Sequence, residues 1–251
     1  MSKKLEIKIK ADDKSLTNTF GKFIVKPLER GYGITVGNAL RRVLLTCLPG
    51  AAITNVKIDG VLHEFSSIEG VHEDVSDIIQ NLKGVRFKLD DNDPEKISIK
   101  LEGPCKFTAG DIQKATSELK VLNKKHYITE INKGTKLDIE IKIGVGKGYT
   151  PSEENELPNA PLGTIAIDSI FNPVTKVMFN VTPVPGAKEP IELLSLEVTT
   201  DGSIEPQDAV SYSATVLMDQ LRIVESISKP EVLEISAVSY THLTLPTIYS
   251  V

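Results

Sequence analysis

The chain of 251 residues is long enough for one large domain or two modest ones, each with a hydrophobic core. Hydrophobic residues make up 40% of it and charged residues 25%, as in an ordinary soluble globular protein. The formal net charge of −5 argues against a surface built throughout to neutralise phosphates. Its two cysteines, Cys47 and Cys105, lack metal-ligand spacing, and such sparse usage suits a reducing compartment. With neither a signal peptide nor an apolar run near the ~20 residues of a membrane span, we expect a cytoplasmic protein.

Polar and apolar residues alternate in four segments, which are 5–10, 55–59, 96–101 and 136–143. Strands with this pattern bury one face and expose the other, as strands of antiparallel sheets do. Parallel sheets covered on both faces would show continuous apolar runs instead. The alternation therefore predicts a largely antiparallel set of strands.

Helical periodicity is confined to residues 35–48, 74–82 and 206–228. Few helices serving many antiparallel strands indicate an α+β fold. Breaks at Pro49-Gly50 and Asn172-Pro173 divide the chain. A turn lies at 90–94 and a polar, acidic loop with prolines at 152–161. We predict two subdomains, one inserted in the other. Residues 1–49 and 173–233 would form the first, residues 50–172 the inserted one, and residues 234–251 a tail.

Three glycines, Gly31, Gly33 and Gly37, follow an expected strand and open the helix at 35–48. A dinucleotide fingerprint places glycines in this way so that the backbone can approach a pyrophosphate at a helix N-terminus. Here the last spacing is one residue too long, and the strands lack the fully buried character of that fold. A tight strand-to-helix turn is the favoured reading, and a nucleotide-binding enzyme is the alternative.

The segment 144–149 resembles a phosphate-cradling loop, but Gly148 follows Lys147 where Ser or Thr is required. It is better explained as the glycine-rich end of a strand. The pairs at His63 and His72, each followed by an acidic residue, lack the spacing of a zinc site on a helix. We find no nucleophile motif and no acidic metal loop. The sequence therefore predicts no active site, no metal and no cofactor in this chain.

The helix expected at 206–228 carries two apolar rows. One follows coiled-coil spacing: Val210, Ala214, Leu217, Leu221 and Val224. The other consists of Ala209, Val216, Ile223 and Ile227. Two apolar rows indicate either a helix buried on both sides within its own chain or a helix that also packs on a second subunit. The pattern alone does not distinguish these two interpretations.

Arg41 and Arg42 are adjacent in an otherwise apolar helix. Neighbouring side chains on a helix point ~100° apart, so the two arginines face different ways. One could pair with Glu29, which would leave the other for a carboxylate on a partner. From the residues alone, a solvated pair of surface arginines is the favoured reading.

Several long motifs, in the right order, closely resemble the α subunit of bacterial RNA polymerase. They are the segments 28–45, 58–65, 69–74, 81–84, 146–151 and 200–206. The similarity spans roughly residues 15–230. It joins unrelated motifs and is therefore specific.

The resemblance implies a scaffold without chemistry of its own that belongs to a nucleotidyltransferase complex. It implies a homodimer held by the two helices at 35–48 and 206–228, and this dimer would recruit the β and then the β′ subunit. The dimer residues implied are Val36, Leu40, Val43, Leu217, Leu221 and Val224. Those implied for β docking are Arg42 and Leu45, and those for β′ docking are Asp77, Lys83, Ile167 and Val174.

The family normally continues into a small helical domain that contacts promoter DNA, and we expect that domain to be absent here. Residues 235–251 contain no Asp, Glu, Lys or Arg, which predicts an unstructured or non-native tail. Without a basic cluster, a DNA-binding module is also disfavoured. We expect no direct DNA binding and no membrane association by this chain.

Overall fold

The computed structural model describes residues 8–11, 15–88, 96–116, 119–184, 186, 190–225 and 227. The turn expected at 90–94 and the tail expected at 234–251 lie outside this part of the chain. Every strand ladder in the described residues is antiparallel. This confirms the predicted α+β class with mostly antiparallel sheets. None of the described helices has both the length and the hydropathy of a membrane-spanning segment.

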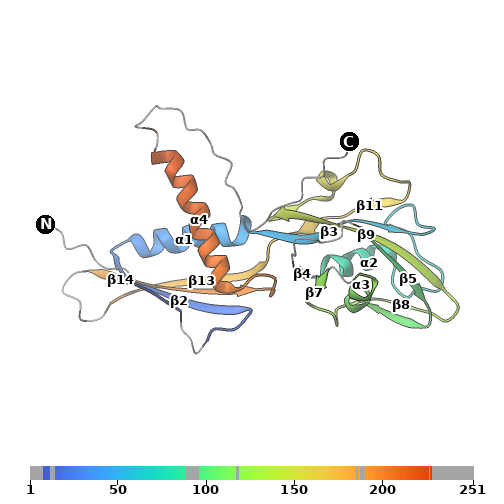
Figure 1. The fold of residues 1–251 in the computed structure, drawn as a ribbon, viewed down its shortest axis with the longest axis horizontal. Helices are drawn as coiled ribbons and strands as arrows, with labels where there is room; N and C mark the ends of the chain where they lie inside the picture. The colour runs from blue at the N-terminus through green and yellow to red at the C-terminus, as the bar shows by residue number, and fades with distance from the viewer. Residues whose placement is uncertain are drawn as a thin grey trace.

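The first sheet has the strand order β1-β2-β14-β13. Its strands are β1 (Lys8–Ala11), β2 (Phe20–Glu29), β13 (Val174–Pro183) and β14 (Ile191–Thr200). Helix α1 (Tyr32–Thr46) lies on this sheet, and α4 (Pro206–Glu225) crosses α1 and extends past it (Figure 1). Buried side chains from both helices and the sheet form one core: Phe23, Leu40, Leu44, Leu48, Val174, Val177, Leu196, Val198 and Ala209.

The second sheet has the order β11-β3-β9-β5. Its strands are β3 (Pro49–Ile58), β5 (Lys96–Glu102), β9 (Lys136–Lys147) and β11 (Thr164–Ala166). Three two-stranded ladders accompany it: β4 (Phe87–Lys88) with β7 (Lys120–Val121), β6 (Cys105–Thr108) with β8 (Tyr127–Ile131), and β10 (Tyr149–Thr150) with β12 (Ser169–Ile170). Helices α2 (Val75–Lys83) and α3 (Ala109–Ala115) and the short 3-10 helix η1 (Ser152–Asn155) complete this part, which has its own core.

Helix α3 has no counterpart among the expected elements. Its first turn is closed by a capping box, in which Asp111 accepts hydrogen bonds from the backbone amide and the hydroxyl of Thr108, both at 2.9 Å. The spacing Thr-x-x-Asp is a sequence signal for a helix start. At seven residues the helix is too short to show a clear apolar period, so only the capping box could have revealed it.

Helix α1 approaches the first sheet closely because two of its residues have no side chain. A Cβ atom added at Gly33 would lie 2.6 Å from Cγ1 of Val181, and one added at Gly37 would lie 2.6 Å from Cδ2 of Phe179. The two glycines are four residues apart, so both face the sheet from successive turns. The expected strand-to-helix turn is completed by Gly31, whose φ of 91° is readily adopted only by glycine.

We predict that Gly37→Val lowers the free energy of unfolding by at least about 1–3 kcal/mol, because the new side chain overpacks the contact with Phe179. Urea denaturation measures the change. Asn38→Val is the matched control, because Asn38 is exposed on the same helix and receives the same side chain. Equal unfolding midpoints for the two variants would show that α1 is not seated through its glycine face.

Candidate subunit-binding surfaces

The N-terminus of α1 is already occupied by a carboxylate of the same chain. Glu192 on β14 accepts a hydrogen bond from the Gly31 amide to Oε1 at 2.9 Å and one from the Gly33 amide to Oε2 at 3.0 Å. These amides are the donors that a bound phosphate would need. Because they are satisfied, and because the surrounding strands are antiparallel, the structure does not support the nucleotide-binding alternative.

The second glycine-rich segment forms the end of β9 and pairs with the start of β3, as expected of a strand end. Lys147 lies opposite Pro49, and Gly146 lies opposite Gly50. A Cβ added at Gly146 would lie 2.7 Å from the ring of Phe171, so the missing side chain makes room for that ring. These glycines therefore serve packing.

Glu73 of the His72–Glu73 pair ties the start of α2 to β8. It accepts hydrogen bonds from the hydroxyls of Tyr127 (2.6 Å) and Thr129 (2.7 Å) and from the Glu130 amide (3.1 Å). Burial raises the pKa of Glu73, but these three bonds outweigh it and hold the pKa below its ordinary value. Burial and the Glu73 carboxylate raise the pKa of Tyr127 to about 12.

This pair therefore has a structural role. Among the described residues, no group of three or more His, Cys, Asp or Glu side chains could hold a metal ion.

The residues expected on α1 differ in exposure, and Leu40, Val36 and Leu45 all contact the first core. Leu40 is buried in the first core, and Val36 and Val43 are half-buried. Arg42 is exposed and Leu45 is half-buried. Within the described residues neither Arg41 nor Arg42 forms an ion pair, so the pairing considered for Glu29 is not present.

Along α4 the apolar rows leave the core part-way. Ala209 is buried, and Leu217 is partly buried against the first core. Beyond it the exposed fractions rise to 64% for Leu221 and 59% for Val224. Figure 1 shows this half of α4 standing clear of α1 and the sheet. The helix is therefore a core element in its first half and an exposed apolar surface in its second.

The four residues expected to dock β′ do not form one surface. Asp77 is exposed on α2, whereas Ile167 and Val174 are only 2% and 3% exposed and belong to different cores. A side chain covered by its own chain has no surface to offer a partner. Direct contact through Ile167 and Val174, as we expected it, is thus not available in this fold. Sequence similarity could not distinguish these buried positions from exposed ones.

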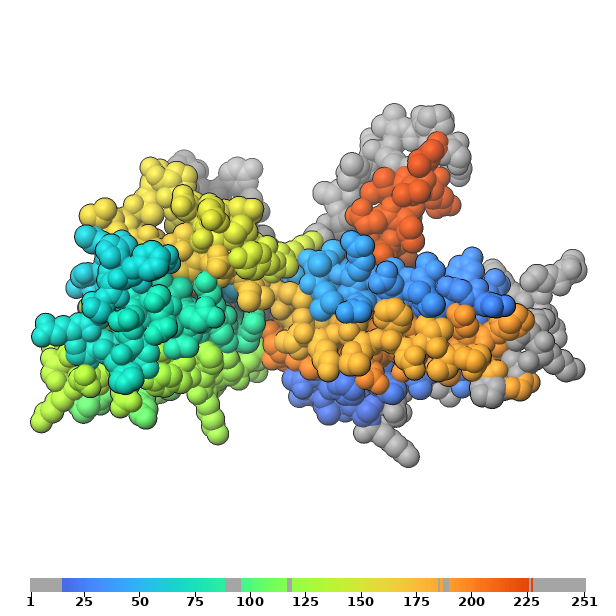
Figure 2. Space-filling view, turned by 180° about the vertical axis from the view of Figure 1, so that it is seen from behind, coloured from blue at the N-terminus to red at the C-terminus, as the bar shows by residue number. Residues whose placement is uncertain are grey.

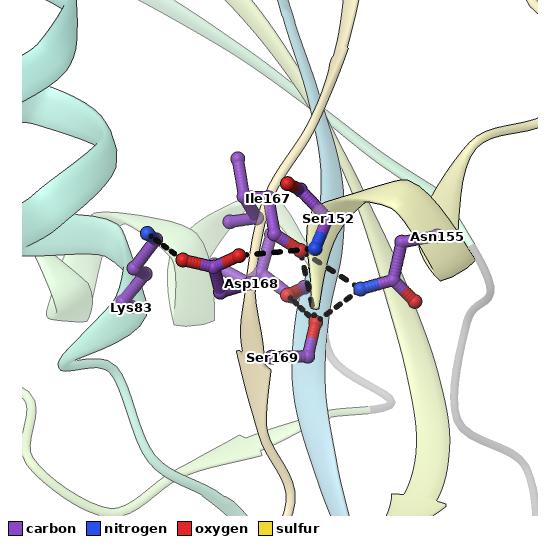
Figure 3. A network of polar contacts seen from close by, with 7 residues as sticks. Lys83, Ser152, Asn155, Ile167, Asp168 and Ser169 are labelled. Atoms are coloured by element: carbon purple, nitrogen blue, oxygen red, sulfur yellow. Dashed lines mark hydrogen bonds and ion pairs between the residues drawn. The ribbon is translucent and has the colours of Figure 1, made fainter. Parts of the chain in front are cut away.

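Lys83, the fourth residue of that set, is engaged inside the chain. Its Nζ donates to Oδ2 of Asp168 at 2.9 Å, and the Ser152 amide donates to Oδ1 at 3.0 Å (Figure 3). The hydrogen bond from Lys83, followed by that from Ser152, holds the pKa of Asp168 below its ordinary value. The carboxylate thus links α2 to η1 and to the segment before β12.

Asn155 continues this network into the interior. Its Nδ2 donates to the Ile167 carbonyl at 2.8 Å and to Oγ of Ser169 at 3.0 Å, and the Ser169 hydroxyl donates to the Ile53 carbonyl at 2.7 Å (Figure 3). Ser169 is 1% exposed, so each of these bonds satisfies a group that burial would otherwise penalise. Ile167 lies in the middle of this arrangement and supports it by packing.

Comparison with known proteins adds independent evidence. A family model described as "RNA polymerase Rpb3/RpoA insert domain" matches residues 56–172. The DNA-directed RNA polymerase subunit alpha of Chloroherpeton thalassium is 47% identical over 222 residues, which cover 88% of this chain and 68% of that protein. The subunits alpha of Prosthecochloris aestuarii and Chlorobium phaeobacteroides are 48% and 49% identical over 225 residues, covering 89% of this chain and 69% of each relative.

The chain belongs to the α-subunit family of DNA-directed RNA polymerase. The resemblance noted in its sequence motifs is confirmed. The range that matches the insert-domain model contains the network of Lys83 and Asp168, whereas α1 and α4 of this α-subunit chain lie outside it.

We predict that Asp168→Asn lowers the free energy of unfolding at pH 7 by about 0.5–1 kcal/mol, a modest value because the Asp168 side chain is 34% exposed to screening solvent. A lowered pKa in the folded state stabilises the fold above the unfolded value of ~3.9, and this contribution disappears as the pH falls through the folded value. The deficit of the variant should therefore shrink below about pH 4. Denaturation at pH 7 and pH 3 tests this, with the exposed Glu64→Gln as control. A deficit that is the same at both pH values would contradict the assignment.

Proposed function

We propose that this chain is a non-catalytic scaffold of DNA-directed RNA polymerase that acts in the cytoplasm. It forms a homodimer and recruits the β and β′ subunits to assemble the core enzyme. Residues 1–49 and 173–233 form the dimerisation subdomain, and residues 50–172 form the inserted one. It has neither an active site nor sequence-specific DNA contacts of its own. The α-subunit relatives support the role in the polymerase, and the surfaces described above support the mode of assembly.

The exposed end of α4 carries the proposal of a homodimer. Met218, Leu221 and Val224 are 51%, 64% and 59% exposed, and Ile227, just beyond the helix, is 80% exposed. A contiguous apolar surface on a helix that projects from its own fold is typical of a protein–protein interface. A second copy of the chain supplies an identical surface. Around a two-fold axis, the exposed half of α4 in each copy would be covered by α4 and α1 of the other copy.

We predict that Leu221→Glu converts the dimer to a monomer or to insoluble protein. Burial of a leucine stabilises by about 1.5–3 kcal/mol, and a two-fold interface loses the contribution of each residue twice. Sedimentation velocity measures the molar mass. Gln220→Glu introduces the same charge at the exposed neighbouring position and should remain dimeric. If Leu221→Glu sediments as an intact dimer, α4 is not the interface.

The C-terminal half of α1 is the proposed β-docking surface. Arg42 is exposed without an ion pair among the described residues, and Leu45 lies three residues further along the same helix. A guanidinium binds a carboxylate through two parallel hydrogen bonds, and an adjacent leucine supplies apolar contact. Arg42 remains available after the chain has folded, whereas Leu45 is half-buried and packs in part against the first core, so only its exposed part can contact a partner.

We predict that Arg42→Ala leaves the dimer mass unchanged but weakens capture of β, because truncation of one partner of a buried charged pair typically costs ~2–5 kcal/mol. Co-purification with tagged β measures the effect. Arg41→Ala is the matched control, since Arg41 is also exposed but points elsewhere. Capture of β that is unchanged in Arg42→Ala would rule out this docking role.

For β′ we propose the exposed face of α2 around Asp77, while Lys83, paired with Asp168, holds the end of that helix in place. Ile167 contributes indirectly, because it packs in the core that also buries α2, whereas Val174 packs in the core of the first sheet. The proposal thus places the β′ contact in the region implied by the family resemblance, and it assigns the contact to the exposed side chains of α2.

A further inference from the structure

A second exposed group lies beside the end of α1. Tyr149 on β10 is 62% exposed, and Ile170 on β12 is 42% exposed. The two residues are directly opposite each other in the antiparallel ladder, so their side chains lie on the same face. We call Tyr149 and Ile170 the ribbon patch.

The ribbon that bears this patch is held firmly. The Phe171 amide donates to the Gly148 carbonyl at 2.9 Å, and Nη1 of Arg86 donates to the Ile170 carbonyl at 3.1 Å. Phe171 itself is buried against the space left by Gly146. An exposed tyrosine on such a support is preorganised, so its burial by a partner costs little conformational entropy.

The ribbon also lies next to the proposed β-docking surface. Gly148, immediately before Tyr149, has a φ of 65°, and a Cβ added there would lie 3.1 Å from the carbonyl oxygen of Thr46. Thr46 is the last residue of α1 and follows Leu45. In Figure 2 the yellow-green atoms around residues 145–150 lie against the blue atoms of α1. A partner that covers the end of α1 therefore meets the ribbon as well.

Tyrosine and arginine are the residue types that, with tryptophan, most often dominate binding energy at interfaces. From this chemistry and this placement we infer that Tyr149 and Ile170 extend the β-docking surface of Arg42 and Leu45. The matching surface of the β subunit would be apolar opposite Tyr149 and Ile170 and would offer a carboxylate to Arg42. This inference rests on the proposed function, in which α1 docks β.

The test measures the affinity of the purified dimer for the β subunit. Tyr149→Ala and Ile170→Ala should each weaken it, Tyr149→Ala by at least about tenfold. The melting temperature and dimer mass should stay unchanged, because both side chains are substantially exposed. Leu162→Ala is the control. Leu162 is 86% exposed in the segment before β11, and its truncation should leave the affinity unchanged.

Each other outcome has a separate meaning. If Tyr149→Ala binds β normally while Arg42→Ala does not, the ribbon patch is not part of the surface, although α1 still docks β. If both variants bind normally, the proposed docking by α1 fails and the inference fails with it. If Tyr149→Ala becomes monomeric, the patch belongs to the dimer instead. Equal losses in Tyr149→Ala and Leu162→Ala would overturn the inference by showing that the loss is not specific.

Discussion

The close contact between α1 and the first sheet is the constraint on which the rest of the molecule depends. Gly33 and Gly37 remove the side chains that would hold the helix away, and Glu192 binds the amides at its start. With α1 fixed in position and rotation, its buried row closes the core, and Arg42 is left at the surface. Because α4 packs across α1, the direction in which α4 projects follows from the same contact.

A different kind of constraint holds the second part of the chain together. Its strands pack through an apolar core, but η1 and the segment before β12 are fixed by the hydrogen bonds of Asp168, Asn155 and Ser169. Such bonds are directional, so they position the backbone more precisely than apolar packing does. Asp168 also accepts a hydrogen bond from Lys83, a residue that the family resemblance assigned to contact with a partner. A charged side chain near a proposed interface can thus form its ion pair within its own chain and stabilise the fold there.

The proposed function depends on surfaces that bind other subunits and requires no catalytic centre. An assembly subunit needs exposed apolar area that is rigidly presented, since flexible area costs entropy when it is ordered by a partner. The second half of α4 exposes apolar side chains on a helix that packs across α1. Tyr149 is exposed on a ribbon held by the hydrogen bonds of Phe171 and Arg86. In the proposed function one surface would bind a second copy and the other the β subunit, so formation of the dimer and capture of β could occur in sequence.

The sequence by itself determined the antiparallel character of the sheets, because alternation with period two indicates one buried and one exposed face. The strands β5 and β9 show these two faces, whereas β3 is buried on both. It also determined the positions of α1, α2 and α4 to within a few residues, and its ordered motifs placed the chain in the α-subunit family. Helix α3 was missed, since seven residues are too few for a periodic signal.

The tertiary structure alone decided which of the apolar residues are available to partners. Leu217 and Leu221 belong to one row in the sequence, yet the first packs on the core and the second is exposed. The reason is that α4 crosses α1 and its second half extends past that helix. The burial of Ile167 and Val174, the carboxylate at the start of α1 and the pairing of Tyr149 with Ile170 were likewise decided there. Each depends on residues distant in the chain, and local periodicity carries no information about such contacts.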